Sequence, residues 1–228
     1  MMAAADDDSL VQKPPRPPAK KRSDFQRSRE LLIETVGQVT PSLTRPASLA
    51  EIARHAGLGQ ATAYRHFSSL DELLGAYFFE IVNQLNEHSQ SSPLEGPSLF
   101  NDVAKRWIEL VLVNGRAMVQ IRSPRGYIER LHEGVDYVVL MDKALQRPIS
   151  ELLRSWDLDP IGNQALQLWN VIFDPREVLD LVNSMNFSKP EIIDRLTTAF
   201  KGALFAVATT QRGMRPPYEK GNDGGPAR

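Results

Sequence analysis

The segment from residue 48 to residue 67 reads SLAEIARHAGLGQATAYRHF, and it decides how the N-terminal part of the chain folds. Ser48 is a typical N-cap residue and Glu51 stands at the spacing of a capping box, so a helix is expected to begin here. Gly57 marks the end of this helix, because glycine adopts the positive φ of a tight turn without steric strain. Residues 59–67 then form a second short helix. The pattern predicts a helix-turn-helix.

The two short helices differ in the side chains that they carry. The first has an apolar face at spacings of three and four residues, which is made by Leu49, Ile52 and Ala53. Leu58 is expected to fill the corner between the helices. The second helix carries small residues that would keep its outer face narrow: Gly59, Ala61 and Ala63. A narrow helix fits the major groove of DNA, which is about 12 Å wide.

The string AGLGQATAYRHF, followed by SSLDELL, resembles the DNA-binding domain of TetR-family repressors. In that family the recognition helix ends in Tyr-x-His-Phe, like Tyr64, His66 and Phe67 here. The resemblance implies that Tyr64 and His66 approach backbone phosphates and that Phe67 is a core residue that fixes the next helix. It is specific over residues 48–74.

Two departures from the family pattern concern the neighbouring helices. Leu70 stands where the family usually has a lysine that touches phosphate. Before the turn that ends the first helix, the family usually has a Phe and later a Gly, whereas this chain has Val39, Thr40 and Pro41. The resemblance therefore says least about the first helix.

The predicted DNA-binding surface centres on the second short helix. Gln60 and Thr62 project from its start, where they can bond to base edges, and an amide such as Gln60 suits adenine. Arg65 can reach a guanine or a phosphate. The alternative for Gln60 and Thr62 is an ordinary solvated helix surface. The complete set of candidate DNA contacts is Ser48, Gly59, Gln60, Ala61, Thr62, Tyr64, Arg65 and His66.

Composition limits the class of protein. The net charge of the 228 residues is −1, so any attraction to nucleic acid must be local. Residues 1–23 are rich in proline and in basic residues and poor in large apolar residues. We expect them to form a disordered arm that either solubilises the chain or enters a minor groove of DNA. The chain has no cysteine, and none of its apolar runs approaches the roughly 20 residues that are needed to span a bilayer. Its first residues are acidic and do not resemble a secretion signal. A cytoplasmic protein with no membrane partner is expected.

The rest of the chain has helical periodicity and no alternation of strand length, so the predicted fold class is all-α. We expect a helix-turn-helix domain with its linking helix over 24–90, a helical ligand-binding and dimerisation domain over 97–210, and a disordered tail over 211–228. Pro148 is expected to kink a long helix, and Asp174 followed by Pro175 is expected to start a new one. The expected helices are 24–40, 69–88, 98–121, 124–132, 135–156, 160–173, a helix from 174 and 189–209.

The signal for catalysis is poor. The four histidines fall in no metal-binding spacing, and the sequence has no Gly-rich phosphate loop and no nucleophile elbow. No cofactor, no metal and no enzymatic activity are therefore expected. An enzyme with an appended helix-turn-helix remains an alternative, since a fold can bring distant residues together.

The resemblance also implies that the C-terminal helices enclose a cavity for a small-molecule inducer. Bulky residues and polar residues on apolar helix faces are the candidates, although such residues are usually core. The candidate ligand-binding residues are Trp107, Asn114, Met118, Tyr127, Trp169, Asn170 and Phe173, with Arg116 and His132 as further polar candidates.

The last helix has an apolar stripe wider than one side of a bundle requires, and its small residues allow close helix approach. TetR-like proteins pair through their last two helices, so the stripe predicts a homodimer that reads the two halves of a palindromic operator. The candidate interface residues are Ile192, Leu196, Ala199, Phe200, Ala203 and Val207.

These observations predict a ligand-responsive, homodimeric transcriptional repressor whose partners are double-stranded DNA, a second copy of the chain and an unknown inducer. The alternative from another class is a helical adaptor or interaction protein whose helix-turn-helix is purely structural.

Overall fold

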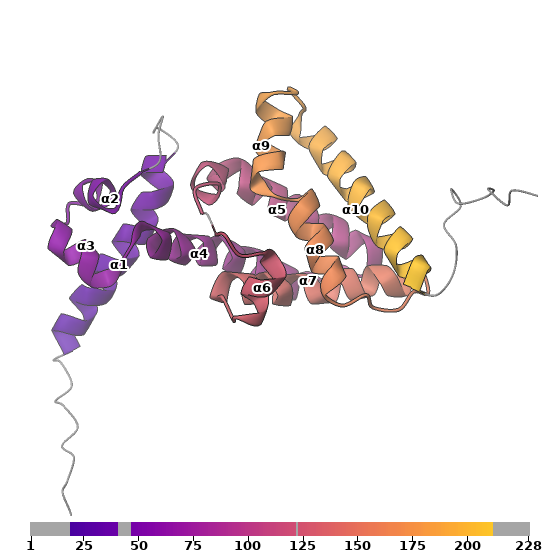
Figure 1. Ribbon diagram of the computed structural model, residues 1–228, viewed down its shortest axis with the longest axis horizontal. Helices are drawn as coiled ribbons and strands as arrows, with labels where there is room; N and C mark the ends of the chain where they lie inside the picture. The colour runs from indigo at the N-terminus through magenta and orange to yellow at the C-terminus, as the bar shows by residue number, and fades with distance from the viewer. Residues whose placement is uncertain (1–18, 41–46, 122, 212–228) are drawn as a thin grey trace, which may run out of the picture.

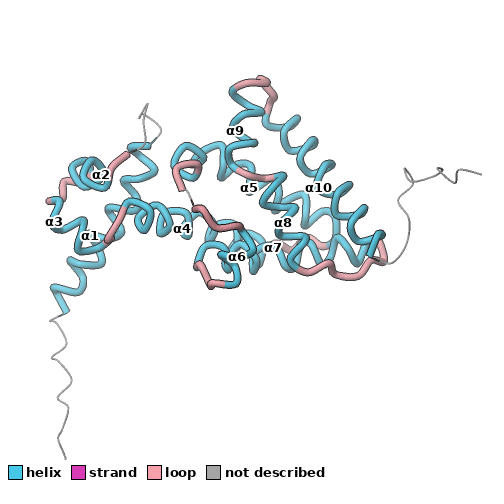
Figure 2. The backbone as a smooth tube through the Cα atoms, viewed as in Figure 1, coloured by secondary structure: helices cyan, strands magenta, loops and turns pink. Residues whose placement is uncertain are grey.

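The computed structural model of the protein describes residues 19–40, 47–121 and 123–211. Within these ranges the chain contains helices and loops and no strand, so the all-α prediction is confirmed (Figure 2). The helices in chain order are α1 (Ala19–Val39), α2 (Leu49–His55), α3 (Gln60–His66), α4 (Leu70–Ser91), α5 (Gly96–Met118), α6 (Tyr127–His132), α7 (Asp136–Ser155), α8 (Asn163–Ile172), α9 (Pro175–Asn183) and α10 (Lys189–Gln211).

Two predicted segments reach beyond the described residues. Most of the expected basic arm, residues 1–18, and nearly all of the expected tail, residues 212–228, lie outside the described ranges. The expected boundary of the arm at residue 23 is wrong, because α1 already begins at Ala19.

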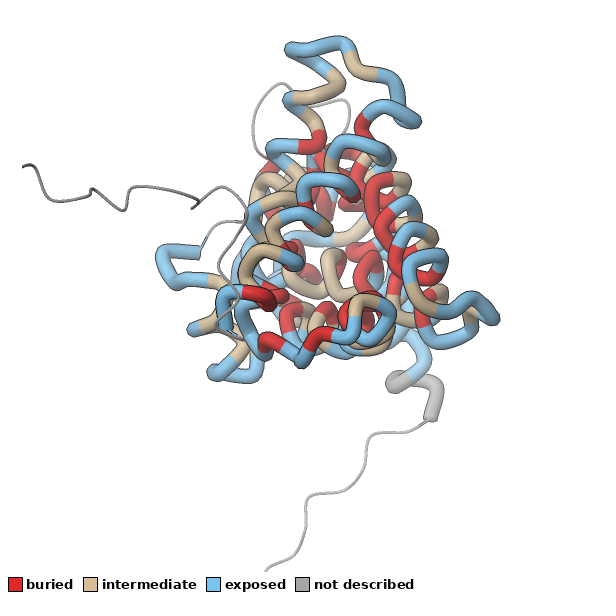
Figure 3. The backbone as a smooth tube through the Cα atoms, turned by 90° about the vertical axis from the view of Figure 1, so that its right-hand side faces the viewer, coloured by how far each residue is buried: buried red, intermediate tan, exposed pale blue. Residues whose placement is uncertain are grey.

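The helices form a small head and a larger body that share one helix. In Figure 1, α1 to α3 make the head at one end, and α4 runs from the head into a body built by α5 to α10. In the body, α4 packs along α7 and α5, while α10 packs against α8 and α5. Figure 3 shows the buried backbone segments inside the body and the exposed ones at its periphery. No helix in the described ranges is both long and apolar enough to cross a membrane.

The core of the head joins its three helices to the start of α4. Leu32 and Val36 of α1 and Phe67 after α3 have almost no exposed surface, and the burial of Phe67 agrees with what the resemblance implied. One expectation is wrong: Ala63 is fully buried, so it faces the core and does not belong to the outer face of α3. Phe25 of α1 is 45% exposed.

The core of the body is an aromatic cluster. Phe100 stacks on Phe200 with ring centroids 5.0 Å apart, and Trp169 stacks on Phe173 with centroids 4.1 Å apart. The indole N–H of Trp107 donates to the carbonyl oxygen of Phe173 at 2.9 Å. Stacked and edge-on aromatic pairs add about 0.5–1.5 kcal/mol each beyond their buried area. The cluster therefore fixes α10 and the end of α8 against α5.

An arginine closes the junction between α4 and α5. The guanidinium of Arg147 on α7 donates to the carbonyl oxygens of Ser92 (3.1 Å) and Leu94 (2.8 Å), and it pairs with Glu151 at 2.9 Å. Glu151 in turn accepts from the backbone N–H of Gly96 at 2.7 Å. Charge-assisted hydrogen bonds from α7 thus hold the chain reversal between α4 and α5. The helix α7 itself continues through Pro148 without a break.

Two contacts tie the head to the body. The hydroxyl of Tyr77 on α4 donates to Asn114 of α5 at 2.7 Å, and a Cβ on Gly37 of α1 would lie 2.7 Å from that same hydroxyl oxygen. The backbone N–H of Ala47, just before α2, donates to the side-chain carbonyl oxygen of Gln120 at 3.2 Å. Gln120 directly follows α5, so the end of α5 contacts the segment that leads into the helix-turn-helix.

The turn between α2 and α3 offers a stability test at a single glycine. Gly57 has a φ of 69°, and a Cβ added there would meet no atom within 4 Å. We expect Gly57→Ala to lower the free energy of unfolding by about 1 kcal/mol, because alanine is strained in left-handed backbone. Gly75 lies inside α4, and a Cβ added there would lie at an ordinary contact distance of 3.8 Å from the ring of Tyr137. Gly75→Ala should therefore raise the free energy of unfolding by about 0.5–1 kcal/mol. Thermal unfolding measures both, and equal effects of the two substitutions would contradict the assignment of strain.

Candidate nucleic-acid interface and cavity

The start of the helix-turn-helix is capped as predicted. The hydroxyl of Ser48 accepts the backbone N–H of Glu51 at 3.2 Å, and the carboxylate of Glu51 accepts the backbone N–H of Ser48 at 3.0 Å. After α2, the backbone N–H of Leu58 donates to the carbonyl oxygen of Ala53 at 2.9 Å across the left-handed Gly57. These local bonds fix the angle between α2 and α3 and therefore the direction in which α3 presents its outer face.

The outer face of α3 presents four of the candidate DNA contacts to solvent. Gln60, Ala61, Tyr64 and Arg65 are exposed, whereas Thr62 is partly buried. The side chain of Tyr64 is 55% exposed, which is unusual for a large aromatic residue. The N-cap Gly59 and the capping residue Ser48 are also exposed, at the two helix starts. This face is available to a groove or to a partner molecule.

His66 does not lie where the resemblance implied. Its ring packs against Phe25 of α1 with centroids 4.0 Å apart, and neither ring nitrogen has exposed surface or a hydrogen-bond partner in the part of the chain that the structure describes. Burial lowers the pKa of His66, and the nearby Arg65 and Arg29 lower it further. The ring is therefore a neutral packing element between α1 and α3, and the prediction that it binds a phosphate is wrong for this conformation. Only the tertiary contact with α1 reveals this.

Arginines from other helices flank α3, and the sequence analysis did not identify them. Arg54 of α2 shares a shallow surface cleft with Gln60. Arg29 of α1 lies with its guanidinium carbon 5.1 Å from the ring centroid of Phe67. Hydrogen bonds from Ser68 lower the pKa of Glu72 in the same region, so this carboxylate is committed to the start of α4. Together with Arg65, these side chains place cations near both ends of α3, Arg54 close to Gln60 at its start and Arg29 close to His66 and Phe67 at its end.

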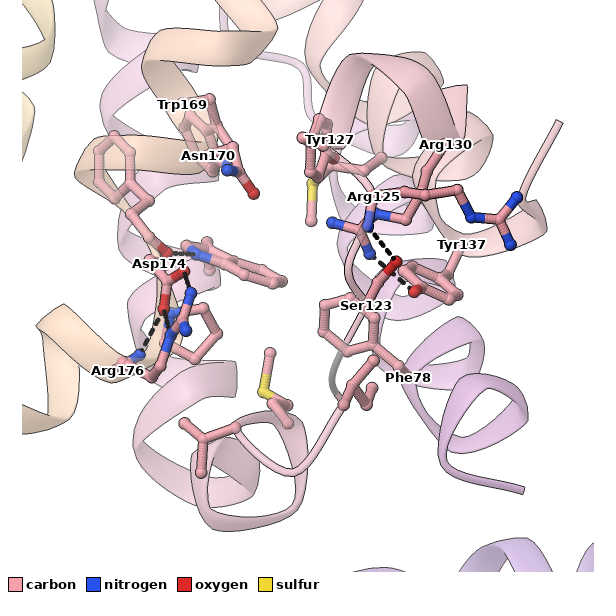
Figure 4. Close-up of a pocket in the computed structure, with 18 residues that line it drawn as sticks. Phe78, Ser123, Arg125, Tyr127, Arg130, Tyr137, Trp169, Asn170, Asp174 and Arg176 are labelled. Atoms are coloured by element: carbon pink, nitrogen blue, oxygen red, sulfur yellow. Dashed lines mark hydrogen bonds and ion pairs between the residues drawn. The ribbon is translucent and has the colours of Figure 1, made fainter. Parts of the chain in front are cut away.

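The body contains a cavity of about 580 Å³, which is lined by side chains from α4 to α9 and from the loops between them (Figure 4). This volume lies within the range of small-molecule sites, about 300–1,000 Å³. Six of the seven candidate ligand-binding residues line it: Trp107, Met118, Tyr127, Trp169, Asn170 and Phe173. The bulky candidates of α5, α6 and α8 therefore lie together at one cavity, where their aromatic packing also makes them core, and their binding of a ligand stays a prediction.

The other polar candidates lie elsewhere. Asn114 accepts from Tyr77 and donates to the carbonyl oxygen of Leu110 at 2.8 Å, so it joins α5 to α4 and does not face the cavity. His132 lies on the surface with its ring nitrogen 3.3 Å from the amide nitrogen of Asn163, and Arg116 is exposed. These positions depend on how α4 and α8 cross their neighbours, which helical periodicity does not specify.

The sequence analysis missed the charged part of the cavity wall. Asp174 accepts from both nitrogens of the Arg176 guanidinium fork, at 3.0 and 2.7 Å. Burial opposes ionisation of Asp174, but these hydrogen bonds outweigh it and lower its pKa. Arg125 pairs with Glu133, and Arg130 donates to the hydroxyl of Tyr137 at 2.9 Å. Their spacing carries no recognisable motif, so the fold alone brings them to one wall.

The predicted dimer stripe on α10 divides into two faces. Ile192 and Phe200 have no exposed surface in the single chain, because they pack into its own core, so their assignment to a partner is wrong. Ala199 is exposed, whereas Leu196, Ala203 and Val207 are partly exposed. The sequence analysis missed the large exposed apolar side chains of the neighbouring surface, Val171 of α8 and Phe205 of α10, which are 61% and 45% exposed.

Comparisons with known proteins agree with this geometry. Residues 44–77 match the family described as "Bacterial regulatory proteins, tetR family". The fold is similar to the crystal structure of a tetR-family transcriptional regulator from Streptomyces coelicolor, with a TM-score of 0.56 and 18% identity over 83% of this chain and 85% of that chain. No curated protein sequence matches the chain.

Two further solved structures are less similar in shape. A putative TetR-family transcriptional regulator from Mesorhizobium loti has a TM-score of 0.48 and 19% identity, and the match covers 80% of this chain and 97% of that one. AmtR from Mycobacterium smegmatis has a TM-score of 0.34 and 19% identity over 89% of this chain and 100% of that one.

The matched residues 44–77 contain the capped α2, the glycine turn, α3 with its exposed outer face and the start of α4. The helical body behind them has the fold of the Streptomyces regulator. Residues 44–77 therefore match the DNA-binding helix-turn-helix region of the TetR family of bacterial regulatory proteins, and the fold of the chain is similar to that of a tetR-family transcriptional regulator.

Proposed function

We propose that this regulator is a homodimeric repressor that binds a palindromic operator and is released from it by a small molecule bound in the body cavity. The observation that carries the proposal is the exposed polar face of α3, held by a complete capping box in the same chain as a cavity of about 580 Å³. A protein–protein adaptor would not require this combination.

On DNA, α3 lies in the major groove. Gln60 reads a base edge, since its amide matches the donor and acceptor pair of adenine. Tyr64 and Arg65 hold phosphates or a neighbouring guanine, while Arg29 and Arg54 add attraction that does not depend on sequence. The buried His66 supports α3 from behind and makes no DNA contact.

A single head makes few base contacts, so specificity requires two heads on one operator. The exposed apolar side chains of α8 and α10, two helices that pack on each other, support pairing through this surface. The two-fold symmetry of such a pair is then mirrored in the operator. In this proposal the interface consists of Leu196, Ala199, Ala203 and Val207, extended by Val171 and Phe205.

The bond between Gln120 and Ala47 supports a route from the cavity to the head. Val119 and Ile121, the two neighbours of Gln120 in sequence, line the cavity. A ligand that displaces this turn also displaces the segment before α2, and it changes the fit of the two heads to the operator. Ligand and operator then weaken each other's binding by the same factor.

The base-reading and phosphate-holding roles predict different losses. Gln60→Ala should reduce discrimination at one base pair of each half-site by about 1–3 kcal/mol, because a bidentate contact is lost. Tyr64→Ala should weaken binding to all sequences alike, and Gln90→Ala, at the far end of α4, should change nothing. Binding to operator libraries at fixed salt measures these effects, and a uniform loss in Gln60→Ala would contradict its role.

The proposed interface predicts that Ala203→Glu gives a monomer. The substitution places one carboxylate from each subunit in a close, dry contact, and an unpaired buried charge costs several kcal/mol. Val139→Glu, at an exposed apolar position of α7, should leave the dimer intact. Light scattering reports the mass, and a dimeric Ala203→Glu protein would exclude this surface.

The link between cavity and head predicts an effect of Gln120→Ala without any ligand. The substitution leaves the buried N–H of Ala47 without its acceptor, which should cost about 1–3 kcal/mol locally. Hydrogen exchange of residues 47–52 should become faster, while the exposed-surface variant Gln146→Ala should exchange like the wild type. Unchanged exchange in Gln120→Ala would show that the bond does not hold the head.

A further inference from the structure

The arginines of the cavity wall differ in how their charges are compensated. Arg176 is neutralised by the two oxygens of Asp174, and Arg125 is neutralised by Glu133. Arg130 also lines the cavity, but it makes no ion pair with any residue in the described ranges. The wall therefore retains one uncompensated positive charge.

This charge is held between aromatic rings. The guanidinium carbon of Arg130 lies 5.4 Å from the ring centroid of Tyr127 and 5.9 Å from that of Tyr137. One terminal nitrogen donates to the hydroxyl of Tyr137, while the Nε atom is buried and has no hydrogen-bond partner among the described residues. A cation in this position has lost part of its solvation by water. An anion bound beside it would replace the lost solvation with charge-assisted hydrogen bonds.

Three further polar side-chain groups of the wall have no hydrogen-bond partner within the described residues: the amide of Asn170, the hydroxyl of Tyr127 and the buried indole N–H of Trp169. Asn170 lies with Trp169 on the wall opposite Arg130, and its amide points into the cavity (Figure 4). Tyr127 lies on the same side of the cavity as Arg130 (Figure 4). Burial raises the pKa of Tyr127, so the phenol stays protonated at neutral pH and can donate a hydrogen bond. The polar groups thus converge on the cavity from two sides.

The space between them is bounded by rings. Phe78, Trp107, Trp169 and Phe173 line the cavity along with the two tyrosines. The indole N–H of Trp107 is already used by the carbonyl oxygen of Phe173, so this residue offers its ring and no donor. Aromatic rings favour flat ligands that stack or meet them edge-on.

We propose that the effector of this cavity is a planar aromatic carboxylate of about two fused rings, whose carboxylate binds Arg130 and Tyr127 and whose far edge carries a polar substituent that bonds to Asn170. The inference rests on the proposed function, in which the cavity receives an effector. Cationic ligands are excluded from this position because they would meet the uncompensated guanidinium of Arg130.

The test compares an acid with its neutral isostere. Binding of 2-naphthoate and of 2-naphthamide to the full-length protein is measured by calorimetry and by quenching of tryptophan fluorescence, since Trp107 and Trp169 line the cavity. Wild-type protein should bind the acid at least about tenfold more tightly than the amide, the ratio expected for one charge-assisted contact. Arg130→Gln should reduce this ratio to about one, and Arg130→Lys should retain most of it.

A matched control and a second contact complete the test. Arg195→Gln also removes a cation stacked on an aromatic ring, that of Phe187, but outside the cavity, and it should keep the wild-type ratio. The acid 6-hydroxy-2-naphthoate should bind more tightly than 2-naphthoate, and Asn170→Leu should abolish that difference. Circular dichroism confirms that each variant is folded.

Equal affinities for acid and amide, a ratio that survives Arg130→Gln, or no binding of either probe would overturn the proposal. These results are separable from a failure of the proposed function, because operator binding is measured on the same preparations. Binding of the acid by a protein that does not bind DNA would refute the repressor and leave this site standing. Release of the operator by the neutral amide alone would keep the repressor and refute the anionic effector.

Discussion

The structure depends on the continuity of α4, which takes part in two cores. Leu73 and Leu74, in its first turn, are buried in the head, whereas Leu85 and Ser89, near its end, are buried in the body. The hydroxyl of Ser89 donates to the carbonyl oxygen of Ala144 on α7 at 2.7 Å, which fixes the far end of the helix. A helix of 22 residues is about 33 Å long and does not bend easily. Rotation of α4 in the body is therefore transmitted to the head.

The two ties between head and body limit how this rotation can occur. Tyr77 fills the space left by Gly37 and bonds to Asn114, so α1 is fixed closely against α4 and α5. The bond from Ala47 to Gln120 is the weaker tie, since it joins a loop to a loop through one neutral hydrogen bond. It also lies beside the cavity wall. In the proposed function, a ligand in the cavity would act first on this weaker contact.

The charges of the cavity follow an uneven pattern. Where an arginine of the wall has a carboxylate partner, as Arg176 has in Asp174, its field is largely cancelled. Arg130 makes no ion pair within the described residues; it lies over two aromatic rings and donates to a phenol, and these contacts stabilise a cation less than a carboxylate does. The asymmetry gives the cavity a direction, with a cationic end and an amide end, which an apolar cavity of the same volume would not have.

The sequence by itself determined what depends on neighbours along the chain. The capping box of Ser48 and Glu51, the left-handed Gly57 and the Asp174–Pro175 start of α9 were all predictable, because each is a bond or a torsion within a few residues. It also grouped most of the cavity residues, since large aromatic side chains on helical faces gather in one core. The tertiary structure alone decided the burial of His66 against Phe25, the bond from Tyr77 to Asn114, the place of Phe200 in the core, and the absence of an ion pair for Arg130 within the described residues. These features depend on how helices cross, and the period of a helix fixes which residues share a face but not which helix that face meets.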